Sequence, residues 1–542
     1  MNLLIENWLP VRTRDGHRTW VSPADLSRSD LVAFDAMRPD FNGALAQLAI
    51  GLLQTTSPAE TSVAWGRLLK TPPDQATLHD WFAPHRPAFE WDGDGARFMQ
   101  DFDLRTGTGE TQSIAGLLIE TPGDNTVKNN ADLFVKRGQV GHLCPHCAAL
   151  ALFTLQLNAP AGGAGHRTSL RGGGPLTTLL IAEARPAETT SLWHSLWLNV
   201  LPQRTFEAHG GGSDDTAAYL KFPWLASVQA IQADGAQTTA MQVHAAHVFW
   251  AMPRRIRLDL EDVSAGLCDL CGRESAVRIQ RYLTRPQGLN YKGAWSHPLS
   301  PYYQTKEGML PLHPQPGGLG YRHWLGWVLG MQNDKRKIAP AAVVGTYFGT
   351  PTEQRTGLRL RLWAFGFDMD NMKARCWYES TLPLYELGDC TPQAQTQLRD
   401  DVGAWLDAAE LVASYLRGAV KEAWFSHDAR GDLSFVDASF WSATEAAFYQ
   451  LLRDRIHAVR QTETTVCTLG MSEQWRNQLT TTASRLFDLD LVGSTAIERQ
   501  NPARIAKARR QFVKNLAGPK LRTVLALPVP ATQSKTTIKK AT

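Results

Sequence analysis

The sequence lacks any apolar run long enough to cross a membrane. Its longest apolar runs, residues 43–53 and 148–157, are about half the ~20 residues that a membrane-spanning helix needs. The opening residues, MNLLIENWLPVR, place Glu6 and Pro10 where a signal peptide would have its apolar stretch, and no small-residue cleavage site follows. We therefore expect a cytoplasmic protein with no membrane partner.

Cysteine is scarce, with seven residues in a chain of 542, which excludes a scaffold held by disulfides. Four of the seven form two CxxC pairs, Cys144/Cys147 and Cys268/Cys271. Two such pairs can supply the four thiolates of one tetrahedral metal shell. Because 120 residues separate the pairs, which is more than in a compact zinc finger, we expect one structural Zn²⁺ ion that joins distant parts of a domain.

Several catalytic signatures are missing. A shell of four thiolates leaves no open position for a water molecule, and no H-x-E precedes the first CxxC, as a zinc deaminase requires. The chain also has no Walker A loop, G-x-S-x-G or H-E-x-x-H motif. These absences indicate that the protein is not an enzyme. For the CxxC pairs, core cysteines, a redox pair, or His142 or His146 as substitute ligands stay open as alternatives.

Acidic residues are absent from the end of the chain. Residues 499–542 contain eleven Lys or Arg and no Asp or Glu, so the preceding residues carry a net charge of −7 against +4 for the whole chain. A basic segment after a neutral-to-acidic body is typical of contact with a polyanion, although a solvated helix face with a loose tail has the same pattern. Another basic cluster, Arg254, Arg255 and Arg257, is expected to be a solvated face or to join a stripe for a phosphate backbone.

The pattern of apolar residues changes near residue 390. Residues 1–390 combine short β-like runs with helical stretches and many Gly and Pro residues, which predicts a large, irregular mixed domain. The β-like runs are residues 1–5, 243–250, 277–283 and 358–365, and helical stretches include residues 44–53 and 147–157. After it, four apolar stripes at helical spacing predict an all-α four-helix bundle over residues 391–527. Pro502 would open the last helix, and residues 528–542 should form a disordered basic tail. The expected fold class is α+β, with the zinc site in the N-terminal domain.

Glycine gathers in residues 159–174, which read APAGGAGHRTSLRGGG and include His166, Arg167 and Arg171. Glycines let the backbone approach a ligand closely, so that N–H groups can meet a phosphate or the edge of a groove. A tightly packed turn would need the same glycines, and both interpretations stay open.

Five segments, in the same order along the chain, resemble the CasA family: MNLLIENWLPVR, LCPHCAALALF, SLRGGGPLTTLL, CDLCGRES and GAWSHPLSPY. CasA is the large subunit of Cascade, the type I-E CRISPR surveillance complex. The resemblance implies a non-catalytic subunit that recognises the protospacer-adjacent motif (PAM) in double-stranded DNA, helps to start strand separation for R-loop formation, and recruits a separate helicase–nuclease in antiviral defence. It also implies the other Cascade subunits and the 5′ handle of the CRISPR RNA as partners.

The resemblance further implies which residues contact the RNA handle and the PAM. In the loop before the first CxxC, Phe134 would be the aromatic anchor on the handle, and Lys136 stands where relatives have asparagine. A glycine loop that contacts the minor groove of the PAM corresponds to residues 161–165. Its members are Ala161, Gly162, Gly163 and Gly165, with Ala161 in place of the family's first glycine.

A hairpin with Asp370, Asn371 and Met372 at its tip corresponds to the wedge that splits the duplex, where some relatives have Asn-Gln-Ala. The family's PAM-contacting lysine aligns with Pro286, so Arg285 or Lys292 would take its place. Two other functions stay open: a purely structural assembly subunit of a nucleoprotein complex, and a zinc-dependent enzyme that acts on nucleic acid.

Overall fold

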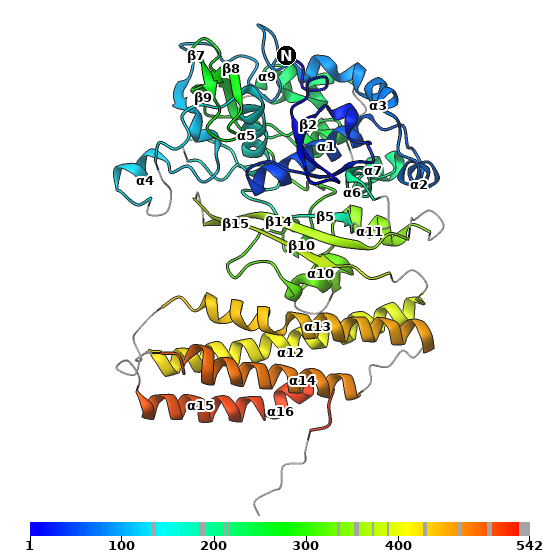
Figure 1. The fold of residues 1–542 in the computed structure, drawn as a ribbon, viewed down its shortest axis with the longest axis vertical. Helices are drawn as coiled ribbons and strands as arrows, with labels where there is room; N and C mark the ends of the chain where they lie inside the picture. The colour runs from blue at the N-terminus through cyan, green and yellow to red at the C-terminus, as the bar shows by residue number, and fades with distance from the viewer. Residues whose placement is uncertain are drawn as a thin grey trace, which may run out of the picture. The chain divides into compact units, whose positions relative to one another are not determined.

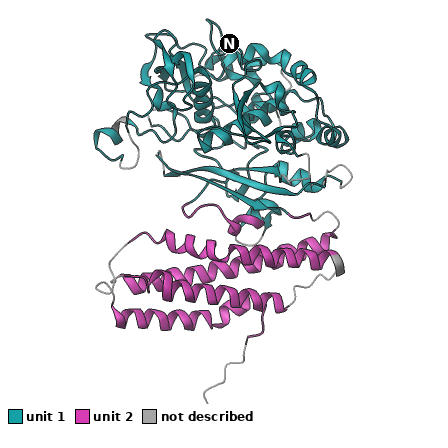
Figure 2. Ribbon diagram, viewed as in Figure 1, with its two compact units in different colours: residues 1–315, 326–384 teal, residues 316–325, 385–542 magenta. Residues whose placement is uncertain are grey.

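The computed structural model describes residues 1–132, 137–163, 165–183, 190–210, 212–213, 216–233, 235–332, 336–351, 357–370, 373–386, 390–425, 431–462, 469–495 and 501–529. The chain divides into two compact units: Met1–Gln315 with Gly326–Leu384, and Pro316–Leu325 with Tyr385–Thr542 (Figure 2). Pro316–Leu325 therefore belongs with the C-terminal helices. The boundary at residue 390 between a mixed N-terminal domain and a helical bundle stays a prediction.

Two apolar helices, α1 (Pro39–Thr56) and α5 (Pro145–Asn158), form the centre of the first unit (Figure 1). They pack against each other, and most of their residues are buried. Both helices are confirmed from their predicted apolar stretches, residues 44–53 and 147–157. The shorter helices before residue 350 are α2 (Ser62–Lys70), α3 (Gln75–Phe82), α4 (Asp124–Lys128), α6 (Leu192–Trp197), α7 (Gln203–Gly210), α8 (Ala218–Lys221), α9 (Val228–Ile231), α10 (Trp324–Val328) and α11 (Ala342–Gly349).

The strands of the first unit form several small sheets, in which all the paired strands are antiparallel. One sheet has the order β2 (Arg18–Val21), β1 (Leu9–Thr13), β3 (Leu31–Phe34); a second has β11 (Gly308–Pro311), β10 (Tyr302–Thr305), β13 (Lys337–Ala339), β12 (Met331–Gln332). Three more groups are β15 (Lys373–Pro383), β14 (Leu360–Asp370), β5 (Thr177–Ala182); β4 (Glu110–Ser113), β9 (Arg281–Arg285), β6 (Arg255–Leu258); and β7 (Val263–Leu267) with β8 (Glu274–Ile279). Segments far apart in sequence therefore lie side by side.

Two of the four β-like runs fall on strands. Residues 358–365 overlap β14, and residues 277–283 cover the end of β8 and the start of β9. The prediction for 243–250 is wrong, because His244 caps a 3₁₀ helix there, Ala245–Phe249, by accepting a hydrogen bond from the Ala246 amide. Residues 1–5 form a turn with a single bridge from Asn2 to Glu90 rather than a strand.

The second unit is a helical region in which α12 (Pro392–Trp424) packs against α13 (Ser434–Thr462), α14 (Leu469–Arg485), α15 (Pro502–Leu516) and α16 (Pro519–Val524). The apolar stripe of α12 is buried, as its spacing predicts. Pro502 opens α15 as predicted, with Asn501 as the N-cap. Among the described helices, none has the length and apolarity that crossing a bilayer requires.

Candidate functional site

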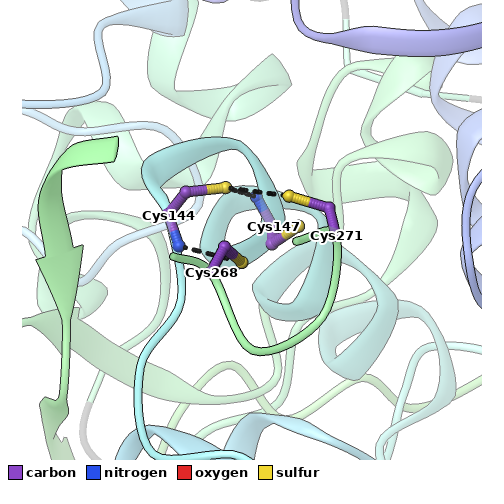
Figure 3. A group of neighbouring side chains, drawn as sticks. All are labelled: Cys144, Cys147, Cys268 and Cys271. Atoms are coloured by element: carbon purple, nitrogen blue, oxygen red, sulfur yellow. Dashed lines mark hydrogen bonds between the residues drawn. The ribbon is translucent and has the colours of Figure 1, made fainter. Parts of the chain in front are cut away.

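The four predicted metal ligands meet in one cluster (Figure 3). Cys144 and Cys147 lie at the start of α5, and Cys268 and Cys271 lie in the connection between β7 and β8. The four sulfur atoms lie within 4.8 Å of one another, and Cys144 Sγ is 3.8 Å from Cys271 Sγ. Four thiolates placed ~2.3 Å from a tetrahedral zinc ion would be about 3.8 Å apart. The cluster could therefore hold a metal ion.

Backbone geometry positions the sulfur atoms. Cys144 is the N-cap residue of α5, and its Sγ accepts a hydrogen bond from the Cys147 amide at 3.4 Å. The Cys144 amide in turn donates to Cys268 Sγ at 3.3 Å. Hydrogen bonds from Cys144 and Cys147 lower the pKa of the Cys268 thiol, whereas the contacts with Cys144 and Cys268 raise the pKa of Cys147. The cluster by itself therefore favours the thiolate at Cys268, one of the four sulfur atoms that would bind metal.

A carboxylate fixes the β7–β8 connection to the segment before α5. Asp269 Oδ2 accepts hydrogen bonds from the amides of Gly141 (2.7 Å) and His142 (2.8 Å), and the Asp269 amide donates to the His142 carbonyl (3.0 Å). His142 and His146, the possible substitute ligands, are not part of the cluster of ligand atoms among the described residues. The four cysteines alone supply a full tetrahedral set.

The loop before the first CxxC contains Phe134 and Lys136, both of which lie outside the described residues. Arg137, in the described part of this loop, pairs with the Asp132 carboxylate at 2.5 Å and donates to the Val127 carbonyl at 3.0 Å. The hydrogen bond from Arg137 lowers the pKa of Asp132. Both ends of this loop are therefore anchored, one by Arg137 and the other by Asp269.

The predicted glycine loop is a tight turn. Gly163 and Gly165 have φ angles of +64° and +87°, a backbone region that side-chain-bearing residues rarely adopt. The His166 amide donates to the Gly163 carbonyl at 2.8 Å, which closes the turn. Ala161 and Gly162 precede it and are half-buried, whereas Gly163 is exposed.

This glycine loop lies against the turn that follows β9. The Gln287 amide donates to the Gly165 carbonyl at 3.0 Å, and a Cβ atom at Gly165 would be 3.3 Å from Pro286 Cβ. Arg285, the last residue of β9, is exposed, and no described residue forms an ion pair with it. Arg285 thus immediately precedes the two residues, Pro286 and Gln287, that contact the glycine loop. Lys292 is also exposed, and its backbone amide donates to the Thr238 carbonyl at 3.1 Å.

Of the predicted wedge, only Asp370 lies within the described residues. It is exposed at the end of β14 and is the register partner of Lys373, the first residue of β15, whereas Asn371 and Met372 lie outside the described residues. Arg375 pairs with the buried Asp368 at 2.7 Å and lies 3.8 Å from Asp370. This arginine partly neutralises the acidic end of the hairpin.

The second group of glycines packs against the strand that leads to the hairpin. Gly174 has a φ angle of +61°, and a Cβ atom there would lie 2.6 Å from the Phe367 carbonyl oxygen of β14. The glycine-rich segment therefore connects the loop beside Arg285 with the base of the hairpin, and it needs glycine for packing at this second position.

The family model described as CRISPR-associated protein Cse1 matches residues 2–486. The chain belongs to the Cse1 family. The chain is similar to CasA from Thermus thermophilus, with 17% identity, 95% of this chain and 99% of that one covered, and a TM-score of 0.66. It is also similar to Cse1 from Thermobifida fusca, with 14% identity, 98% of this chain and 99% of that one covered, and a TM-score of 0.64. A chain of a CRISPR RNA-guided surveillance complex is similar as well, with 18% identity, 96% of this chain and 99% of that one covered, and a TM-score of 0.69. These likenesses show the same fold, and the CasA resemblance is confirmed.

One basic cluster of this Cse1 chain was interpreted wrongly. Arg255 and Arg257 form neither a solvated face nor a phosphate stripe, because both are buried in β6. Arg255 pairs with the buried Asp101 at 2.6 Å, and Arg257 donates to the Asp101 carbonyl at 3.1 Å. Asp101 is far from β6 in sequence, so the residues of β6 alone gave no sign of this partner.

Arg171 is likewise unavailable for phosphate. Its side chain is buried and donates to Thr177 and Ser300, at 3.0 and 2.9 Å, and to the Gln47 amide oxygen. Burial lowers the pKa of Arg171 to about 10. Sequence reasoning also missed the role of Arg254, whose guanidinium lies beside the glycine loop.

Proposed function

We propose that this chain is the large, non-catalytic subunit of a type I-E Cascade complex, and that it recognises the PAM in double-stranded DNA, helps to start strand separation and recruits a helicase–nuclease. Membership of the Cse1 family supports this assignment. The likeness to a chain of a CRISPR RNA-guided surveillance complex supports the Cascade subunits and the CRISPR RNA handle as partners.

The observation that carries the proposal is the pairing of the glycine loop with an exposed arginine. Gly163 and Gly165 present backbone without side chains, and Arg285 stands at the adjacent turn. The minor groove is about 6 Å wide, and its negative potential attracts arginine. Bare backbone fits such a groove closely. Asp370, Asn371 and Met372 would then enter the base step next to the PAM, as wedge side chains do in other proteins that unstack DNA.

We further propose that the cysteine cluster holds one structural Zn²⁺ ion. Its donor set is four thiolates, which fill the tetrahedral shell and leave no site for an activated water molecule. The ion would fix the β7–β8 connection to α5, and with it the end of the loop that carries Phe134 and Lys136. These two residues would contact the RNA handle, by stacking and by charge. The helices α12 to α15 would form the predicted four-helix bundle.

Target-duplex binding by a reconstituted complex tests this function, with and without the chain, over a library of trinucleotides that flank the target. We expect binding to require the chain and to favour particular flanks. Binding that requires the chain but is equal for all flanks would instead support a purely structural assembly subunit. Hydrolysis or deamination of the nucleic acid by the zinc-loaded chain alone would support an enzyme.

Arg285→Gln is expected to weaken binding to the preferred flank by about 10-fold, because one arginine contact in a groove contributes roughly 1–3 kcal/mol. The matched control is Arg281→Gln, since Arg281 is an exposed arginine at the other end of the same strand, paired with Asp262 at 2.6 Å. Dissociation constants from gel shift or interferometry check the prediction. Equal losses in the two variants would contradict a specific contact by Arg285.

A further inference from the structure

Arg254 is held rigidly at the base of the glycine loop. Its amide donates to the Gln156 side-chain oxygen at 3.0 Å, and the Gln156 side-chain nitrogen donates to the Arg254 carbonyl at 2.9 Å. Gln156 is fully buried in α5. At the other end of the side chain, Nη2 donates to the Pro160 carbonyl, just before the loop begins. The arginine therefore links the core helix to the start of the glycine loop.

The guanidinium of Arg254 also occupies the space next to Gly162. A Cβ atom at Gly162 would lie 2.5 Å from Arg254 Nη1 and 2.5 Å from His166 Cβ. Real Cβ atoms do not approach other atoms this closely, so residue 162 must be glycine while the arginine keeps this position. The glycine at 162 and the arginine at 254 thus form one packed unit, although they are far apart in sequence.

This cation has no counter-ion in the described part of the chain. No described carboxylate pairs with Arg254, and its buried Nε atom donates to no described group. Burial lowers the pKa of Arg254 to about 10. A half-buried cation without a carboxylate is costly in the free protein, and the cost would fall when a negative potential is brought next to it.

We propose that Arg254 is a positioning residue for flank recognition. It fixes the position of the glycine loop relative to α5, and its unpaired charge is compensated by the DNA minor groove that the loop enters. The inference rests on the proposed function, and it deepens that function by naming the group that sets the loop. The guanidinium is half-buried against Gly162 and the Pro160 carbonyl, so it favours the groove without reading a base edge. Arg254 therefore differs in role from the exposed Arg285.

The test compares Arg254→Met and Arg254→Lys with the wild-type chain in the reconstituted complex. Flank preference is measured as the ratio of dissociation constants for the best and worst flanks, and thermal unfolding of the isolated chain is measured in parallel. Methionine keeps the unbranched apolar stem but removes the charge and the hydrogen bond to Pro160. Arg281→Gln again controls for the loss of one positive charge in the neighbouring strand.

We expect Arg254→Met to lower affinity for the best flank by about 10-fold and to bring the ratio close to 1, while the unfolding midpoint changes by no more than about 2 °C. Lysine restores the charge but not the planar guanidinium, so it should recover only about 3-fold of the lost affinity and give a flank ratio between those of the methionine variant and the wild type. A purely structural role would lower the midpoint and weaken all flanks equally.

An unchanged ratio in Arg254→Met would overturn the inference alone, provided that the wild-type complex discriminates between flanks. Absence of discrimination in the wild-type complex would overturn the proposed function as well. If the methionine variant does not assemble, the lysine variant decides: a ratio below that of the wild type, with an unchanged unfolding midpoint, supports the inference, and a wild-type ratio contradicts it.

Discussion

Cys268→Ser is expected to remove the bound zinc ion and to lower the free energy of unfolding by more than about 4 kcal/mol. The reason is that Cys268 is buried and accepts a hydrogen bond from the Cys144 amide. Its loss therefore removes one metal ligand and one hydrogen bond between the two CxxC pairs. The metal would close a loop of 120 residues between Cys147 and Cys268. Cross-links that close loops of this length stabilise the folded state chiefly by restricting the unfolded chain.

Metal content by mass spectrometry and unfolding in denaturant check this prediction. We expect about one zinc ion per wild-type chain and almost none in the variant. Cys376→Ser is the matched control, because Cys376 lies in β15 outside the cluster and is half-buried. A Cys268→Ser variant that keeps its zinc, or a wild-type chain purified without any metal, would contradict the proposed metal site.

Gly165→Ala is expected to weaken binding to the preferred flank by at least about 10-fold, since a left-handed backbone costs an alanine roughly 1–2 kcal/mol and a contact adds to this cost. The φ angle of Gly165 is +87°, and the new Cβ atom would lie 3.3 Å from Pro286. Relief of the strain would move the loop away from the turn that holds Arg285. The dissociation constants for preferred and unpreferred flanks measure the effect.

Gly16→Ala is the control for backbone strain. Gly16 has a similar φ angle, +90°, but no described atom lies within 4 Å of its Cβ position, in the connection between β1 and β2. Both variants should lose stability, Gly165→Ala somewhat more because of its contact with Pro286, while only Gly165→Ala should lose flank-dependent binding. Equal effects on DNA binding would contradict a role for the glycine loop at the DNA.

The sequence predicted the elements whose side chains are buried in a regular pattern. The apolar runs of α1 and α5 and the stripe of α12 each follow the period of a helix, and these helices are confirmed. The metal cluster was predictable because the CxxC spacing limits the chemistry of the four thiols. In all these cases the information lies within a short window of the chain.

Contacts between distant segments could not be predicted in this way. Arg255 was expected at the surface because its partner, Asp101, lies on a segment 154 residues away. The run 243–250 has a β-like composition, but the cap by His244 and its tertiary surroundings favour a 3₁₀ helix. The position of Arg254 beside Gly162 depends on how α5, β6 and the glycine loop pack together, so no local sequence pattern predicts it.

The most direct test of the account is binding to PAM duplexes whose bases are altered in one groove at a time. Inosine in place of guanine removes the minor-groove amino group, and 7-deazapurines remove the major-groove N7 acceptor. We predict that reconstituted complexes containing this chain respond to inosine, or to 2,6-diaminopurine in place of adenine, by about 10-fold and are nearly indifferent to 7-deazapurines. Sensitivity to 7-deazapurines with indifference to the minor-groove changes would contradict recognition by the glycine loop.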